Sequence, residues 1–182
     1  MTRRSSTEGA PQASTPRAGT PQAGRVSAWW FLDTLVIEHS MATDTGLRVL
    51  EMTLPVGAAP PLHVHEDYDD SFFLVEGQVV MRSGDELTLA SAGRWVSTPR
   101  GTPHGFRVVG VRPARMLLVL ENDSFTELIR DLGEPAGSAA LPEAGSGPGA
   151  DEVFRALAAH DVTVLGPSLS DQEAQAFLVS RG

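Results

Sequence analysis

The chain has 182 residues, which is enough for one domain with a substantial core and too few for two once flexible ends are set aside. Its formal net charge of -9 opposes binding to a phosphate backbone, so nucleic acid is not an expected partner. The absence of cysteine excludes disulfides and thiolate metal sites. No apolar run approaches the roughly 20 residues that span a bilayer, so we expect no membrane partner and a cytoplasmic location.

The N-terminal segment 1–27 repeats Thr-Pro and Gly/Ala/Gln elements and holds almost no large apolar side chains. Such a segment cannot bury enough surface to offset the entropy of ordering, so we expect a disordered tail. The ordered domain is expected to begin at Ala28, beside the apolar cluster Trp29, Trp30 and Phe31.

The middle segment 28–122 contains short runs of β-branched, aromatic and aliphatic residues, separated by turns rich in glycine. This alternation is typical of an all-β sandwich or barrel. We expect strands at residues 34–39, 47–54, 71–75, 78–82, 86–89, 95–98, 105–109 and 114–120.

The last segment, 123–182, changes its apolar spacing from two residues to about three and a half, which predicts helices. Ser124 with Glu127, and Ser170 with Glu173, have the spacing of a capping box. We expect helices at 125–132, 151–160 and 170–179, joined by a flexible Gly/Pro/Ala linker near 135–150. This helical extension is expected to pack on the outside of the barrel or over its mouth.

Two histidines, His63 and His65, stand two residues apart in a segment that reads as extended. Because side chains alternate along a strand, both imidazoles project from the same face and can share one metal ion. A pair of this kind is common by chance, so the surrounding sequence decides its meaning.

A longer pattern surrounds the pair, and it consists of Gly57, His63, His65, Asp70, Gly77, Gly93, Pro99, Gly101 and His104. Its order and spacing resemble the two motifs of the cupin superfamily, G(X)5HXH(X)3-4E(X)6G and G(X)5PXG(X)2H(X)3N. The resemblance implies a double-stranded β-helix, or jelly-roll barrel, with short C-terminal helices. It also implies one divalent metal ion, Fe, Ni, Mn, Cu or Zn, bound by His63, His65, His104 and Asp70.

Two positions depart from the motifs. Asp70 stands where the family has glutamate, one methylene longer, so it ligates the ion directly, binds through a water, or leaves the ion to the histidines. Asp69 and Glu66 are neighbouring carboxylates that could substitute, although only Asp70 has the family spacing to Gly77. Val108 stands where the second motif ends in asparagine.

Further residues on the ligand strands are expected to face the barrel interior, because every second side chain on a strand shares one face. Core packing is their first expected role, and lining a substrate pocket is the second. These residues are Phe72, Leu74, Phe106 and Val108.

The segments 53–65, 71–77, 97–106 and 164–169 look like those of the bacterial quercetinase-like monocupins. Members of that group include quercetin 2,3-dioxygenases, which open a flavonol ring with dioxygen at a metal site. The resemblance implies a metal-dependent dioxygenase of a flavonol or a related aromatic polyphenol or polyketide, in which Asp70 is the catalytic base.

Two alternative functions stay open. The first is a redox-neutral cyclase or isomerase of a secondary-metabolite intermediate, and the second is a non-catalytic cupin that binds a small molecule. Monocupins of this type commonly pair, so a homodimer is also expected, with Trp29, Trp30 and Phe31 as its candidate interface.

Overall fold

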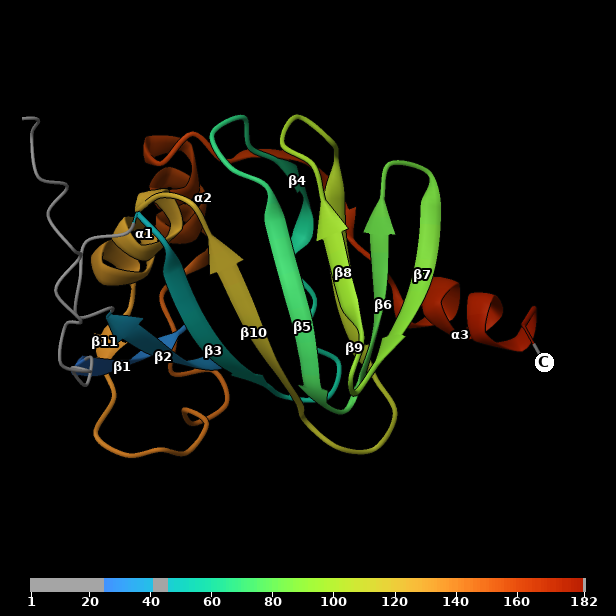
Figure 1. The fold of residues 1–182 in the computed structure, drawn as a ribbon, viewed down its shortest axis with the longest axis horizontal. Coiled ribbons are helices and arrows are strands. Elements are labelled where there is room, and N and C mark those ends of the chain that lie inside the picture. The colour runs from blue at the N-terminus through green and yellow to red at the C-terminus, as the bar shows by residue number, and fades with distance from the viewer. Residues whose placement is uncertain (1–24, 41–45, 182) are drawn as a thin grey trace, which may run out of the picture.

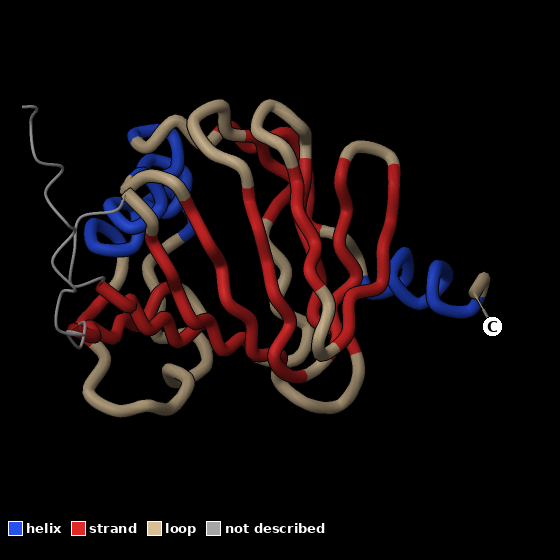
Figure 2. The backbone as a smooth tube through the Cα atoms, viewed as in Figure 1, coloured by secondary structure: helices blue, strands red, loops and turns tan. Residues whose placement is uncertain are grey.

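The computed structural model describes residues 25–40 and 46–181, and these form two antiparallel β-sheets and three helices (Figures 1 and 2). The strands are β1 (Arg25–Phe31), β2 (Thr34–Ser40), β3 (Arg48–Leu54), β4 (Pro61–Val64), β5 (Asp70–Glu76), β6 (Gln78–Ser83), β7 (Glu86–Ser91), β8 (Trp95–Thr98), β9 (His104–Val109), β10 (Ala114–Leu120), β11 (Glu134–Pro135) and β12 (Thr163–Ser168). The helices are α1 (Ser124–Leu132), α2 (Ala150–Ala159) and α3 (Asp171–Val179).

The first sheet has the strand order β11-β1-β2-β3-β10-β5-β8, and the second has the order β12-β4-β9-β6-β7. The core lies between the sheets, and β10 shows why these residues form a strand. Its residues alternate strictly in burial, with Ala114, Met116, Leu118 and Leu120 facing inward. This period of two is what one buried sheet face requires, and the predicted all-β fold class is confirmed.

All the predicted strands are present, with ends shifted by no more than two residues. Residues 25–27, which the sequence assigned to the tail, belong to β1, because β1 pairs with β2 from Arg25↔Ser40 to Phe31↔Thr34. The rest of the predicted tail, 1–24, lies outside the described residues.

The C-terminal extension is not purely helical, because it contributes β11 and β12 to the two sheets. β12 pairs with β4, and Val164 stands opposite His63. β11 pairs with β1 through Trp29↔Pro135 and Trp30↔Glu134. The extension is therefore part of both sheets as well as a cover for them.

The apolar cluster proposed as a dimer interface is largely covered by its own chain. Phe31 is buried in the core, and Trp29 and Trp30 are half-buried. The indole Nε1 of Trp30 donates to the carbonyl oxygen of Ala140 at 2.9 Å. The homodimer stays a prediction, and these residues offer it less free surface than the sequence suggested.

The three helices appear where the spacing predicts them. α1 and α2 lie together at one end of the sheets, whereas α3 lies at the other (Figure 1). The capping box of Ser170 and Glu173 is confirmed. The one predicted at Ser124 and Glu127 is wrong, because Asp123 is the N-cap and Ser124 is already the first helical residue.

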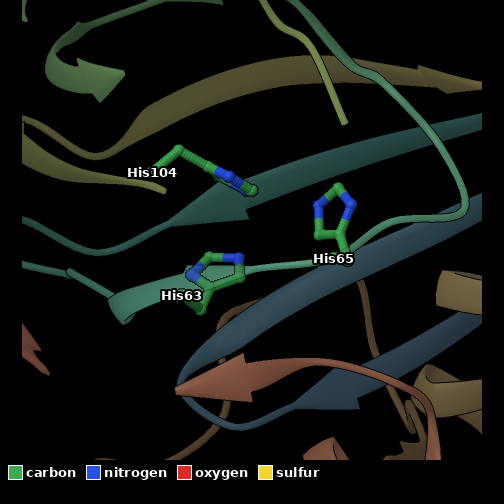
Figure 3. A group of neighbouring side chains, drawn as sticks. All are labelled: His63, His65 and His104. Atoms are coloured by element: carbon green, nitrogen blue, oxygen red, sulfur yellow. The ribbon is translucent and has the colours of Figure 1, made fainter. Parts of the chain in front are cut away.

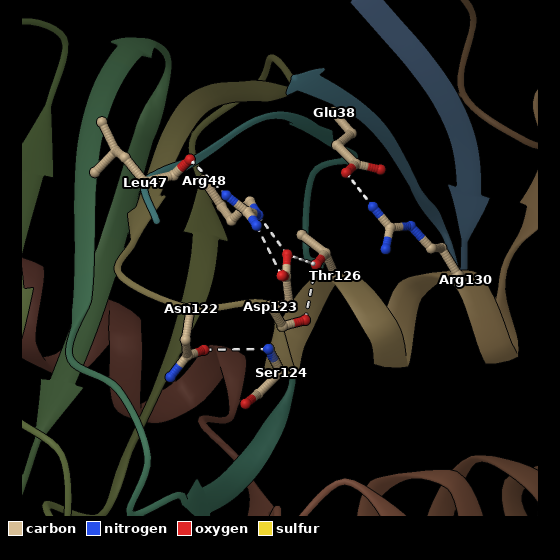
Figure 4. A network of polar contacts seen from close by, with 8 residues as sticks. All are labelled: Glu38, Leu47, Arg48, Asn122, Asp123, Ser124, Thr126 and Arg130. Atoms are coloured by element: carbon tan, nitrogen blue, oxygen red, sulfur yellow. Dashed lines mark hydrogen bonds and ion pairs between the residues drawn. The ribbon is translucent and has the colours of Figure 1, made fainter. Parts of the chain in front are cut away.

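Polar contacts fix α1 to the first sheet (Figure 4). Asp123, at the start of α1, accepts hydrogen bonds from the guanidinium of Arg48 in β3, one of them 2.7 Å long. Arg130 pairs with the buried carboxylate of Glu38 in β2. In the described part of the chain, no helix is both long and apolar enough to cross a bilayer.

Candidate metal centre

Three histidines converge where β4 meets β9. His63 in β4 stands directly opposite His104, the first residue of β9, and His65 follows the end of β4. One ring nitrogen from each lies within 4.8 Å of the others. Figure 3 shows the three rings gathered around one space. The structure therefore brings together the three histidines that the sequence singled out.

Backbone contacts fix which nitrogen of two rings carries the proton. The Nδ1 atom of His63 lies 2.8 Å from the carbonyl oxygen of Pro61, and that of His104 lies 2.8 Å from the carbonyl oxygen of Thr102. A carbonyl oxygen only accepts, so both Nδ1 atoms donate. Each neutral ring then has a lone pair on Nε2, as a metal-ligating histidine does.

An unpartnered buried nitrogen supports the fit of these residues to a metal ion. The Nε2 atom of His104 is buried and makes no hydrogen bond. It lies 3.1 Å from Oδ2 of Asp70, although the contact lacks hydrogen-bond geometry. A lone pair and a carboxylate at this distance repel each other unless a positive charge, a proton or a metal ion, lies beside them.

Asp70 begins β5 and is buried against two of the three histidines. Its Oδ2 lies 3.6 Å from Nε2 of His65 and 3.1 Å from Nε2 of His104. Burial raises the pKa of Asp70, but its contacts with His104 and His65 outweigh this and lower the pKa to about 2. Asp70 is therefore a carboxylate at neutral pH.

The other two carboxylates that the sequence left open take different places. Asp69 accepts hydrogen bonds from the backbone and the guanidinium of Arg100, at 2.9 and 2.8 Å, and these lower its pKa. Glu66 is exposed and lies against Gly101. Of the three carboxylates, Asp70 is the one in contact with the histidines.

His63 and His104 differ in how their surroundings shift the pKa of the ring. Burial, followed by the charge of His104, lowers the pKa of His63 to about 4, so His63 is neutral at pH 7. Burial also lowers the pKa of His104, but its contacts with Asp70 outweigh this and raise it overall. His104 is thus the ring on which a proton would compete with a bound metal ion.

Sequence reasoning missed Tyr68, whose ring stacks on His65 with centroids 3.8 Å apart and planes at 18°. The side chain is buried, and burial raises its pKa above the ordinary value. Its position in the sequence, between the histidine pair and Asp70, is the signal from which it could have been predicted. Tyr68 holds the plane of the His65 ring by contact.

The motif glycine Gly101 positions the loop that precedes His104. Its N–H donates to the carbonyl oxygen of His65 at 2.8 Å, and its φ of +71° favours glycine. A Cβ atom there would lie 3.0 Å from the carboxylate of Glu66. The glycine therefore allows the loop after His65 and the loop before His104 to approach each other.

A pocket of about 460 Å³ adjoins the histidines, and His63 is on its lining. Of the residues predicted to line a pocket, Phe106 does so, whereas Phe72, Leu74 and Val108 are buried in the core. The sequence did not indicate that the hairpin of β1 and β2, the loop with Gly145, Gly147 and Pro148, and α2 would also contribute to the lining.

Two antiparallel sheets around one core, with three histidines clustered where β4 meets β9, are the arrangement expected of a jelly-roll cupin. Residues 50–120 match the family model described as the cupin domain, so this segment is a cupin domain and the family resemblance is confirmed.

Among curated proteins, the quercetin 2,3-dioxygenase of Bacillus subtilis is 29% identical over 131 residues, which cover 71% of this chain and 39% of that protein. The chain thus spans about two fifths of the length of this relative. The match supports the predicted likeness to the quercetinase-like cupins.

Two solved structures illustrate the range of similar folds. KdgF from Halomonas sp. is 20% identical, with a TM-score of 0.45 over 52% of this chain and 86% of that chain. The polyketide cyclase RemF from Streptomyces resistomycificus is 20% identical, with a TM-score of 0.44 over 53% of this chain and 72% of that chain.

Proposed function

We propose that this chain is a metal-dependent cupin enzyme that oxidises an aromatic polyphenol, a flavonol in the first instance, with dioxygen. The observation that carries the proposal is the convergence of three imidazole donors beside a pocket with a largely apolar lining. The similarity to a quercetin 2,3-dioxygenase supports the choice of reaction.

In this proposal His63, His65 and His104 hold one divalent ion, and Asp70 completes the ligand set. A bound Fe, Ni, Mn, Cu or Zn ion would supply Lewis acidity toward adjacent substrate oxygens. His63 stands on the pocket lining, so a substrate approaches the ion from the side of that ring.

Asp70 has two candidate roles, as a ligand and as the base that takes the substrate hydroxyl proton on Oδ2. Its pKa of about 2 makes it a weak base at neutral pH. Its contacts are with His65 and His104, and it is not on the described lining of the pocket. These observations favour the ligand role, with proton transfer as the second.

The experiment combines elemental analysis of the purified protein with oxygen-electrode assays on a panel of flavonols. We expect metal at about one ion per chain, and oxygen uptake that requires both metal and substrate. Turnover that continues under anaerobic conditions would instead identify a redox-neutral cyclase or isomerase. Binding without turnover in either atmosphere would identify a small-molecule-binding cupin.

The homodimer and the cytoplasmic location belong to the same proposal. Light scattering at micromolar concentration is expected to give a mass about twice 19.3 kDa. A monomeric mass would remove the dimer without affecting the metal site, because all three histidines come from one chain.

A further inference from the structure

The pocket beside His63 is closed by parts of the chain that lie outside the cupin-domain match of residues 50–120. Strands β3, β4 and β9 provide one side of it. The hairpin between β1 and β2 contributes to the other side, together with an outer wall that consists of Gly145, Gly147, Pro148, Val153 and Leu157. Segments outside the matched residues therefore share in shaping this pocket.

The outer wall lies directly against the hairpin. A Cβ atom on Gly147 would lie 3.5 Å from the carbonyl oxygen of Leu32, which is ordinary van der Waals contact. Val153 and Leu157 of α2 pack against the main core, beside the half-buried Phe125. The wall is therefore packed onto the barrel, and a ligand would lie between the two.

The pocket offers a ligand few polar partners. Of the described lining residues, Asp33, Thr34 and His63 have polar side chains. The Thr34 hydroxyl already donates to Oδ1 of Asp33 at 3.1 Å, and Asp33 is exposed at the rim. Away from His63, the side chains left to accept a hydrogen bond from a ligand hydroxyl are the exposed Asp33 carboxylate and the Thr34 oxygen.

The volume of about 460 Å³ lies within the range of pockets that enclose small organic molecules, about 300–1,000 Å³. A ligand hydroxyl buried there without a partner loses its water and gains nothing, which reduces affinity roughly tenfold or more. Aromatic carbon surface, by contrast, gains from leaving water.

We propose that the outer wall restricts this pocket to flat aromatic ligands whose ring buried away from the chelating oxygens carries at most one hydroxyl. This inference rests on the proposed function for the position of the chelating oxygens. Its other support is the apolar lining and the packing of α2. The substrate class is therefore aromatic hydroxyketones with at most one hydroxyl on the buried ring.

Helix α2 supplies a matched control on an adjacent strip of its surface. Phe154 is 50% exposed and lines a second hollow, together with Ala158 and Val162, and it is not on the lining of the first pocket. A substitution at Leu157 therefore changes the first pocket, whereas the same substitution at Phe154 changes the second hollow.

The first measurement is anaerobic calorimetric titration of the whole protein, at known metal content, with 3-hydroxyflavone and with quercetin, which adds hydroxyls on both outer rings. We expect 3-hydroxyflavone to bind about tenfold more tightly. Equal affinity, or tighter binding of quercetin, would overturn the inference. Because no turnover is involved, this result is separate from the oxygen-uptake test of the dioxygenase.

The second measurement repeats both titrations with Leu157→Gln and Phe154→Gln. The amide in Leu157→Gln offers hydroxyls a partner, so the preference for 3-hydroxyflavone should shrink severalfold, whereas Phe154→Gln should leave it unchanged. Val153→Thr, nearly isosteric, is the second variant if Leu157→Gln fails to fold by circular dichroism. An equal shift in Leu157→Gln and Phe154→Gln would contradict a role for the outer wall.

Discussion

The metal centre and the outer wall of the pocket are built from different kinds of structure. His63, His104 and Asp70 lie on paired strands, and His65 follows directly after one. The outer wall comes from residues 145–148, which form neither helix nor strand, and from α2, none of whose residues is fully buried. The candidate ligands are thus held mainly by ladders of hydrogen bonds, whereas the outer wall is held by packing and by few polar contacts, among them that of His160, the C-cap of α2, with Asp131 at 2.8 Å. The wall can therefore change in sequence without moving the ligands.

The largest effect is expected when one of the three clustered histidines is replaced. His63→Ala, His65→Ala or His104→Ala removes one of three converging donors, so metal content by elemental analysis should fall close to zero. His39→Ala is the control, because His39 lies on β2 and pairs with Glu51 at 3.4 Å. Full metal content in all three variants would mean that these residues hold no metal.

A smaller effect is expected at the neighbouring carboxylate. Asp70→Asn removes a buried charge next to His65 and His104, so metal affinity should fall roughly 10- to 100-fold. Asp69→Asn, in the same loop but paired with Arg100, should retain metal, and so should Asp70→Glu. Metal affinity is measured by competition with a chelator. If Asp69→Asn binds metal more weakly than Asp70→Asn does, Asp70 is not the carboxylate that supports the metal.

The barrel itself should tolerate little change at its motif glycine Gly77, which has a φ of +77°. A Cβ atom at Gly77 would lie 2.8 Å from Cα of Ala114 and from the carbonyl oxygen of Pro113. Gly77→Ala should therefore lower the free energy of unfolding by about 2 kcal/mol or more. Gly84→Ala, with a φ of +58° and nothing within 4 Å, should cost only about 1 kcal/mol. Equal urea midpoints for the two variants would show that the close approach is unimportant.

The smallest effect concerns the polar contacts that hold α1, and with it Phe125, against the sheet. Hydrogen bonding to Arg48 lowers the pKa of Asp123, so its contribution to stability is present at neutral pH and is lost as the pH falls through that lowered pKa. Asp123→Asn should melt about 2 °C below the parent at pH 7. The difference should disappear at a pH below that lowered pKa, where the Asp123 carboxyl is protonated and both forms are uncharged. A difference that is the same at both values would exclude the ion pair as its cause.

The parts that could be predicted from sequence are those encoded by local spacing. His63, His65 and His104 were found because the motifs fix their separation within two short segments. β12 was missed because its sequence contains Gly166 and Pro167, which argue against a strand interior. It is the edge strand of its sheet, where a proline can be accommodated. The pocket could not be predicted, because Leu157 and His63 meet only through tertiary packing.

The pairing of β4 with β12 has a consequence for how the protein acquires its metal. β4 meets β9 through the single pair His63↔His104, whereas β12 pairs with it from Pro61 to Val64. Contacts between segments so far apart in sequence form slowly, because closing the long intervening loop costs entropy. In a nascent chain, residues 163–168 must therefore leave the ribosome before β12 can hold His63 in place. Metal loading should follow barrel closure, and a chain shortened before Thr163 should fold its other strands and still bind metal poorly.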